Sequence, residues 1–253
     1  MTQRHSYILK LLQAEESVKV ADLADMLKVS LVTIRKDLKI LESKSLLFRT
    51  HGFISKSDPY PKEVNVNEKE SIFLDEKIRI GQAAAQLVNN NNPILIASGT
   101  TVLQMAKQLN TAERKNLMIV TSAMNVAMAL CEKPNIEILQ LGGIVRHSST
   151  SVVGPYAESM LQGLAFSTLF LGVDGIEAEY GCSTSNVLEA KLNSEMIKVA
   201  QKTIVLTDSS KFGKKGFGRI CGLSDIDQII TDKNITPQSA KKIEEAGVEL
   251  TIV

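Results

Sequence analysis

The 253-residue sequence lacks long hydrophobic runs, since no apolar stretch approaches the roughly twenty residues that span a bilayer. Its first residues, Met1 to His5, also lack the apolar core of a secretory signal peptide. Both absences argue against an integral membrane protein and against an exported one. We therefore expect a cytoplasmic protein that has no membrane partner.

Cysteine is also scarce. The three cysteines, Cys131, Cys182 and Cys221, are odd in number and widely spaced, and no Cys or His lies near them in a zinc-binding pattern. This spacing argues against a framework of disulfides. We predict reduced cysteines in the core or in a pocket wall, and we expect neither a metal nor a cofactor.

The composition is that of a globular protein, with 44% hydrophobic and 23% charged residues, and the length allows one large or two modest domains. The net charge of +1 hides an asymmetry. Residues 1–57 carry ten Lys or Arg against six Asp or Glu, whereas residues 58–253 carry nineteen against twenty-two. A basic amino-terminal part on an acidic body indicates that the first part meets a polyanion such as DNA.

Residues 18–52 have the pattern of two short helices, a tight turn between them and a hairpin after them. Apolar residues recur on one face of residues 20–27, as in a short amphipathic helix, and Lys28-Val29 provides the turn. The Ser30 hydroxyl can then accept a hydrogen bond from a free amide two or three residues later. A second helix is therefore expected to begin at Leu31.

The second helix separates apolar from polar residues. Its expected inward stripe is Leu31, Ile34, Leu38 and Leu41. Its expected outward residues are Thr33, Arg35, Lys36 and Lys39. Arginine can bind guanine edges in the major groove of DNA, while Lys and Thr contact phosphates. The pattern therefore favours a helix-turn-helix over about residues 20–39, although any solvated amphipathic helix could show it.

Residues 46–54 alternate in polarity and turn at Gly52, which is typical of a small hairpin or wing. Arg49 and His51 are expected near its tip, facing the DNA backbone. A helix over residues 2–13 would complete a three-helix core through its apolar residues Ile8, Leu11 and Leu12. The predicted DNA-binding residues are thus Ser30, Thr33, Arg35, Lys36, Lys39, Arg49 and His51.

Residues 4–55 resemble the winged helix-turn-helix of the DeoR family of bacterial transcriptional regulators. The resemblance rests on Arg4, Ile8, Leu9, Leu23, Ala24, Val29, Ser30, Thr33, Ile34, Arg35, Asp37, Leu38, Leu41, Glu42, Leu46, Arg49, His51 and Gly52. Two positions depart from the family pattern, because Ser45 and Phe53 stand where the family usually has Gly. The resemblance implies binding to a double-stranded DNA operator.

The run from residue 55 to residue 71 is polar, contains two prolines and shows no sustained period. We predict a linker over residues 58–71, between a DNA-binding domain of residues 1–57 and a second domain of residues 72–253. Proline stiffens such a linker. Limited freedom is useful if a ligand must change the spacing of two DNA-reading domains.

Beyond this linker, short apolar runs alternate with segments of helical pattern. The runs are 94–97, 118–120, 136–141, 169–173, 204–207, 229–231 and 250–253. The helical segments are 75–88, 101–109, 123–130, 155–163, 187–200 and 237–246. This alternation predicts an α/β domain with a mostly parallel sheet that is covered on both faces. In such sheets ligands bind outside the carboxyl ends of the strands.

Small, hydroxyl or charged residues follow five of these strands. They are Ser98, Gly99, Thr100, Thr101, Ser122, Gly142, Gly143, Arg146, Asp174, Glu189, Asp208 and Lys211. Residues 98–101 open a helix, where free amides and hydroxyls can cradle a phosphate. Each residue by itself is more often a turn or a cap. Together they favour a hydroxylated polyanionic ligand, with either Lys211 or Arg146 as its cation.

These stretches, over residues 72–253, resemble the carboxyl-terminal sensor domain of the DeoR family, whose fold is related to ribose 5-phosphate isomerase and glucosamine 6-phosphate deaminase. The resemblance places the ligand pocket at 98–101, 142–143, 174–175, 189–190, 208, 210 and 211. It implies a phosphorylated sugar or sugar alcohol as effector and a repressor of a catabolic operon. Ala97 and Asn186 replace residues that are commonly acidic in the family, so both are expected to remove negative charge from the pocket.

Two functions remain open. The first is a ligand-controlled repressor, and the second is a sugar-phosphate isomerase or deaminase with a fused DNA-binding domain. Asp174, Glu189 and Asp208 could move a proton next to a carbonyl, but Ala97 lacks a carboxylate and His147 lies in a Ser-rich loop. We therefore expect a regulator without catalytic residues. An operator with two-fold symmetry requires two DNA-binding domains, so we also expect a homo-oligomer, either a dimer or a tetramer.

Overall fold

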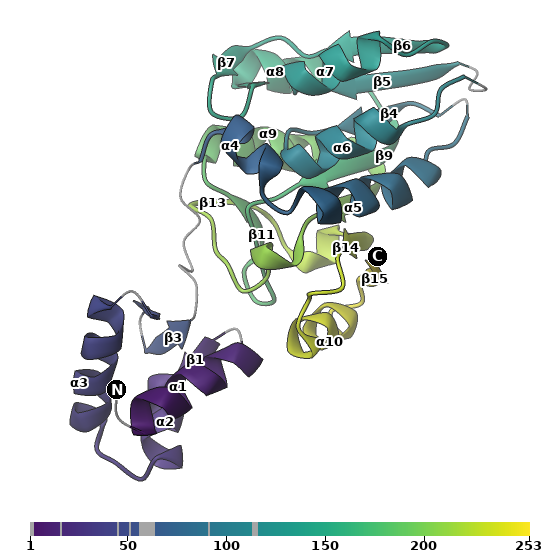
Figure 1. Cartoon of the computed structure of the whole chain (residues 1–253). Coiled ribbons are helices and arrows are strands. Elements are labelled where there is room, and N and C mark those ends of the chain that lie inside the picture. The colour runs from purple at the N-terminus through teal and green to yellow at the C-terminus, as the bar shows by residue number, and fades with distance from the viewer. Residues whose placement is uncertain are drawn as a thin grey trace.

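The computed structural model describes residues 3–15, 17–44, 46–50, 52–55, 64–90, 92–112 and 116–253. Figure 1 shows a small amino-terminal group of helices with a short sheet, followed by a larger α/β part. Among the residues described, no helix is both long and apolar enough to cross a membrane.

The amino-terminal part contains the predicted helices and hairpin. Its helices are α1 (Gln3–Ala14), α2 (Val20–Met26) and α3 (Leu31–Ser43), and its strands are β1 (Ser17–Lys19), β2 (Phe48–Thr50) and β3 (Phe53–Ser55). The helices pack on a core that includes Ile8, Leu23, Ile34, Leu38, Leu41 and Ile54. The strands form an antiparallel sheet in the order β1-β3-β2. The strand β1 was not expected, because three residues are too few to show a period.

Ser30 caps α3 as predicted, since its Oγ accepts a hydrogen bond from the Thr33 amide at 3.2 Å. The predicted inward position of Leu31 is wrong, because this side chain is 43% exposed. The buried face of α3 is rotated away from Leu31 towards Asp37, which is only 7% exposed. Leu31 instead lines a groove beside the hairpin.

The larger part contains a parallel sheet of seven strands among the residues described, in the order β15-β14-β12-β9-β4-β5-β6. Their bounds are β4 (Ile94–Ile96), β5 (Leu117–Thr121), β6 (Ile136–Gln140), β9 (Phe166–Gly172), β12 (Ala200–Leu206), β14 (Gln228–Thr231) and β15 (Glu249–Ile252). The inner strands are rich in buried Ile, Leu and Val, as strands covered on both faces require. Each predicted apolar run coincides with one of these strands.

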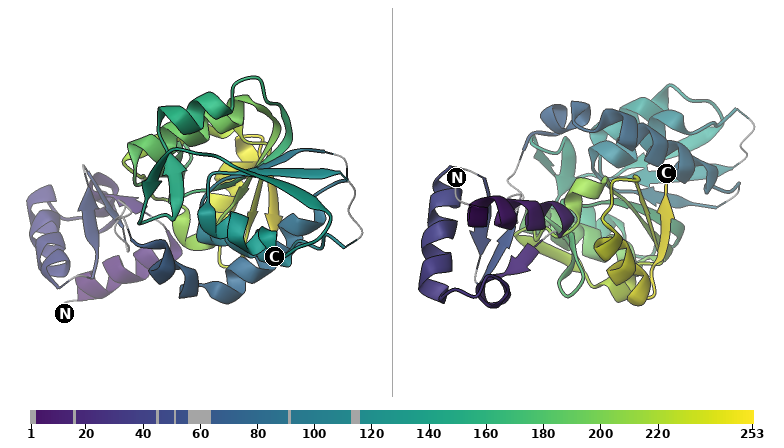
Figure 2. Two further views of the ribbon diagram at one scale, coloured as in Figure 1. Left: turned by 90° about the horizontal axis from the view of Figure 1, so that it is seen from above. Right: turned by 60° about the horizontal axis from the view of Figure 1, so that its bottom comes forward.

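Helices cover both faces of this sheet (Figure 2). They are α5 (Leu74–Gln86), α6 (Thr100–Gln108), α7 (Met124–Cys131), α8 (Pro155–Met160), α9 (Val187–Lys198) and α10 (Pro237–Glu245). One hydrophobic core joins the sheet to α5, α6 and α7, and a second joins its other face to α8, α9 and α10. The α/β fold with a mostly parallel sheet is therefore confirmed.

The strand order has one reversal. From β4 the chain adds β5 and β6 in one direction, whereas from β9 it adds β12, β14 and β15 in the other. Neighbouring β4 and β9 thus form a topological switch point, where the loops that follow the two strands diverge. Ligands in open α/β sheets bind at such a point.

Several short elements were not expected. They are α4 (Val66–Ser71), β7 (Ile144–Arg146), β8 (Ser151–Val153), β10 (Gly175–Glu177), β11 (Gly181–Thr184), β13 (Gly218–Cys221) and the 3-10 helices Ser209–Lys211 and Leu223–Asp225. The helix α4 lies in the stretch that was expected to be linker. Its six polar-rich residues show no period, and contacts to the rest of the domain hold it in place.

The cysteines carry no disulfide. Cys182 and Cys221 are buried and face each other across β11 and β13, as a core position predicts. For Cys131 the predicted burial is wrong, since it is exposed. The buried face of α7 is formed by Val126 and Leu130, and the next residue on a helix points about 100° away.

Candidate functional site

The outward face of α3 presents the side chains that the sequence assigned to DNA. Arg35, Lys36 and Lys39 are exposed, and Thr33 is half-buried. The hydroxyls of Ser30 and Thr33 lie 3.0 Å apart and bond to each other at the start of the helix. The surface therefore offers cations on one side of a helix that has the dimensions of a major-groove reader.

A groove separates α3 from the hairpin. Its lining includes Lys19, Arg35, Arg49 and Glu42. The Arg49 guanidinium lies 3.6 Å from the Glu42 carboxylate, so this ion pair ties the hairpin to α3. His51, the other residue expected near the tip, lies outside the described residues.

Asp37 joins α3 to α1. Its carboxylate accepts a hydrogen bond from Arg4 and lies 3.1 Å from Nε2 of His5. The Arg4 hydrogen bond, opposed by burial and assisted by His5, lowers the pKa of Asp37 below its ordinary value. An ionised Asp37 at neutral pH thus fixes the orientation of α3 against the first helix.

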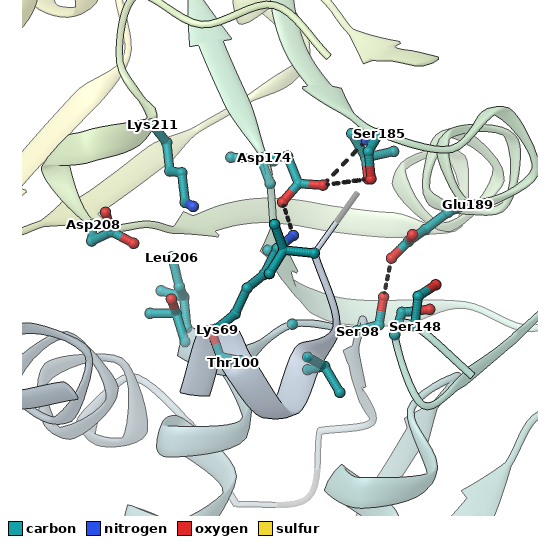
Figure 3. Close-up of a pocket in the computed structure, with 18 of the residues that line it drawn as sticks. Lys69, Ser98, Thr100, Ser148, Asp174, Ser185, Glu189, Leu206, Asp208 and Lys211 are labelled. Atoms are coloured by element: carbon teal, nitrogen blue, oxygen red, sulfur yellow. Dashed lines mark hydrogen bonds and ion pairs between the residues drawn. The ribbon is translucent and has the colours of Figure 1, made fainter. Parts of the chain in front are cut away.

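A pocket opens at the switch point between β4 and β9 and encloses about 630 Å³, including its open mouth. Figure 3 shows side chains from several elements that converge on it. Nine of the predicted effector residues line it: Ser98, Gly99, Thr100, Thr101, Arg146, Asp174, Glu189, Asp208 and Lys211.

The start of α6 forms one wall. Gly99 is its N-cap and supplies no side chain to bond the first amides of the helix. A close approach of β9 supports this turn, since a Cβ on Gly172 would lie 2.8 Å from the Ser98 carbonyl oxygen. Thr100 and Thr101 line the pocket, and the N-cap side chain makes no bond to the first amides of α6, as in helix starts that bind anions.

Asp174, after β9, is the most connected carboxylate of the pocket (Figure 3). Its Oδ1 receives a hydrogen bond of 2.6 Å from Lys69 Nζ, and its Oδ2 receives bonds from the Thr184 hydroxyl and from the amide and hydroxyl of Ser185. Burial raises the pKa of Asp174, but the Lys69 charge, with help from Lys211 and Ser185, outweighs burial and lowers it overall. The group is therefore an anion at neutral pH.

Glu189, in the first turn of α9, behaves in the opposite way. Burial raises its pKa, and the hydrogen bond that its Oε1 accepts from the Ser98 hydroxyl at 2.5 Å only partly offsets that effect. The charge of Asp174 raises it further. The pKa of Glu189 is thus raised while that of neighbouring Asp174 is lowered, and both carboxyl groups can bond to the hydroxyls of a ligand.

Three cations line the described part of the pocket wall, namely Lys69, Arg146 and Lys211. Arg146 Nη2 donates to the Ser148 hydroxyl at 2.9 Å. Asp208 accepts from the amide and the hydroxyl of Ser210. Lys211 points into the open space near Asp174 (Figure 3).

Three predicted residues, Ser122, Gly142 and Gly143, do not line this pocket. The Ser122 carbonyl accepts from the Val152 amide at 2.9 Å. Gly143 has a φ of 154°, and a Cβ there would lie 2.8 Å from the Val153 carbonyl oxygen, so glycine permits the close return of the β7–β8 hairpin. These residues shape the fold at this edge of the sheet.

Ala97 and Asn186, which were expected to remove negative charge from the pocket, lie outside its lining. Ala97 is fully buried in the core between the sheet and its helices. The Asn186 side chain caps α9, since it accepts from the amides of Leu188 and Glu189. Neither side chain lines the pocket.

The pocket also contains residues that were not predicted. They are Val64, Val66, Lys69, Ser148, Ser149, Thr184 and Ser185, with Gly172, Val173 and Leu206. Thr184 and Ser185 precede a helix in the sequence, and their hydroxyls could have been included on that ground. Lys69 gave no signal, because it lies in a polar run that resembles a linker.

Comparison with known proteins identifies two families along the chain. The DeoR-like helix-turn-helix domain matches residues 4–57, and the DeoR C terminal sensor domain matches residues 72–233.

Full-length relatives are also found. A protein of Escherichia coli O157:H7, whose name assigns it to repression of the aga operon, is 37% identical and covers 100% of this chain and 94% of its own. The HTH-type transcriptional regulator YulB of Bacillus subtilis is 34% identical, with coverage of 100% and 97%. The lactose phosphotransferase system repressor of Staphylococcus epidermidis is 30% identical, with 90% of both chains covered. These relatives are named as regulators or repressors, which decides against the alternative of an isomerase or deaminase.

Among solved structures, ribose 5-phosphate isomerase A from Neisseria gonorrhoeae has a TM-score of 0.39 at 16% identity. It covers 55% of this chain and 53% of its own.

Proposed function

Because the chain belongs to the DeoR family of DNA-binding transcriptional regulators, we propose that it represses an operon for sugar or sugar-alcohol catabolism under the control of a phosphorylated sugar. Its helix-turn-helix reads a double-stranded operator. The effector binds in the pocket between β4 and β9. The protein acts in the cytoplasm, where its DNA is.

One observation carries the assignment of the effector. At the switch point, the uncapped start of α6 lies in the same pocket as Arg146 and Lys211. Helix amides together with a cation are a common way to hold a phosphate. The remaining wall supplies carboxylates and hydroxyls, such as Asp174, Glu189 and Ser185, which suit the hydroxyls of a sugar.

The names of the relatives support a link to sugar metabolism. One relative is named for a lactose phosphotransferase system and another for the aga operon. The first of these names mentions a sugar, lactose, and the second mentions an operon. The proposal therefore concerns the class of effector, a phosphorylated sugar or sugar alcohol.

The division of the chain follows from the same family. We propose a DNA-binding domain over residues 1–57 and a sensor domain from residue 72 onward. The chain acts as a dimer or tetramer, because an operator with two-fold symmetry requires at least two DNA-binding domains.

The test is a gel shift with DNA from upstream of the protein's own transcription unit. The full chain should retard this DNA and not a scrambled fragment of equal length. Members of a panel of sugar phosphates should change the retardation, while inorganic phosphate and the unphosphorylated sugars should not. Retardation that no sugar phosphate changes would contradict the assignment of the effector.

A further inference from the structure

The helix α4 is the first described helix after the DNA-binding domain, and it is bonded to several sides of the pocket. At its start, the Val66 amide donates to the Ser148 carbonyl at 2.7 Å. At its middle, Lys69 reaches Asp174. The segment that links the two domains therefore passes into the wall of the pocket before the sheet begins.

The ion pair of Lys69 is well protected. The Lys69 side chain is 24% exposed and that of Asp174 is 14% exposed. An ion pair that is shielded from water in this way is screened less by salt than a surface pair. By contrast, the other ion pair of α4, between Glu70 and Lys107, is at the surface, with side chains 36% and 43% exposed.

Hydrogen bonds from α5 hold the end of α4. Lys77, on α5, is only 3% exposed, and its Nζ donates to the carbonyls of Lys69 and Ile72 at 2.5 and 2.6 Å. These bonds fix the backbone of Lys69 itself. Two partners thus hold Lys69, since Lys77 bonds its backbone carbonyl and Asp174 bonds its ammonium group.

Resting on the proposed function, we propose that α4 is a latch that connects occupancy of the pocket to the DNA-binding domain. In this structure, Lys69 pairs with Asp174. When a phosphorylated ligand binds, its anionic group takes the Lys69 ammonium from Asp174. The docking of α4 then changes, and with it the start of the segment that leads to the DNA-binding domain.

The balance of charges explains why an anion has this effect. Among the described residues, the three cations of the pocket face three carboxylates, Asp174, Glu189 and Asp208. One of these cations, Lys69, is held by the Asp174 carboxylate at 2.6 Å. A phosphate carries up to two negative charges and offers three acceptor oxygens, so it competes with a carboxylate for an ammonium group.

The first test needs no ligand and uses hydrogen–deuterium exchange of the full chain, followed on peptides that cover residues 64–72. Lys69→Met and Asp174→Asn should each speed exchange there by at least about tenfold, because each breaks the shielded pair. The double variant should exchange no faster than the faster single variant. The matched control Lys107→Met, which breaks the surface pair, should change exchange by less than about twofold. Unchanged exchange in both single variants would overturn the latch.

The second test measures binding to the upstream DNA. Lys69→Met should shift the affinity by at least about fivefold in the direction that the effective sugar phosphate shifts the wild type, and the added ligand should shift it no further. If Lys69→Met bound DNA as the wild type does and merely failed to respond, Lys69 would be a ligand contact and the latch would be wrong. A wild type that responds to no sugar phosphate would instead remove the proposed effector, while the exchange experiment still decides on the latch.

Discussion

Individual cations on α3 are expected to have different tasks at the operator. Arg35 is exposed and lines the groove beside the hairpin, where it can reach base edges. Replacing it by Ala should cost roughly 1–3 kcal/mol of specific binding, whereas Lys36→Ala should weaken binding to all sequences and reduce the salt slope by about one. Titration of operator and random DNA at several salt concentrations measures both effects. Lys241→Ala, at an exposed position of α10, is a control for net charge. Operator binding by both α3 variants at the wild-type level would exclude this recognition helix.

Lys211 is the residue that separates ligand binding from DNA binding. Its ammonium points into the pocket, far along the chain from α3, so Lys211→Met should leave operator affinity intact and raise the effective concentration of the sugar phosphate by at least about tenfold. If Lys211 only formed a solvated pair with Asp208, worth under about 1 kcal/mol, the response would survive. Operator release titrated against the sugar phosphate distinguishes the two cases. The control Lys215→Met removes a nearby cation that pairs with Glu177, and this variant should respond to the sugar phosphate as the wild type does. A normal response by Lys211→Met would leave Arg146 as the next cation to test.

Among the elements, those with a long hydrophobic period were predictable and those held by tertiary contacts were not. The strands of the parallel sheet and the helices on its faces bury continuous or periodic apolar residues, so the sequence alone located them. The helix α4 has one buried hydrophobic residue, Val66. Short helices are marginal without tertiary support, and here the support comes from Lys77 and Asp174, which follow it in the chain.

The same distinction applies to the pocket. Residues after the strands of a parallel sheet meet at one edge, which is why nine of the predicted residues converge. The positions of Ser122, Gly142 and Gly143 depended on the β7–β8 hairpin, whose strands are too short to show a pattern. Lys69 depended on the folding of a polar run against the domain, which no local property of that run indicates.

The anchoring of α4 by a buried lysine predicts how stability depends on pH. Burial lowers the pKa of Lys77 to about 8 from an ordinary 10.5, with smaller effects from Asp208, Lys211, Lys69 and Glu70. Between these values the unfolded chain binds the proton and the folded chain does not, so this group makes the unfolding free energy rise with pH. Denaturant unfolding at pH 7.5, 8.5 and 9.5 measures the slope, and Lys77→Met should reduce it relative to the wild type and to Lys241→Met. An unchanged slope would mean that Lys77 keeps an ordinary pKa.

At the scale of the whole molecule, the charge asymmetry and the two matched domains place DNA reading and ligand sensing in separate parts of the chain. The residues between the two domains are one path by which a ligand in the sensor can control binding to DNA. Since α4 lies at the end of that stretch and also lines the pocket, a boundary that cuts α4 away should damage the sensor even though the sheet remains whole.

Two fragments test this division. Residues 64–253 and residues 72–253 both keep the sheet and its helices, so both should fold and oligomerise without the DNA-binding domain. The shorter fragment lacks Lys69 and leaves the Asp174 carboxylate without its cation, which should lower its free energy of unfolding by roughly 1–3 kcal/mol. Gel filtration and denaturant unfolding measure the two properties, and Lys69→Met in the longer fragment should reproduce most of the loss. Aggregation of the longer fragment would contradict the proposed domains. Equal stability of the two fragments would mean that the Lys69–Asp174 pair contributes nothing to the fold, which would contradict the place of α4 in the sensor.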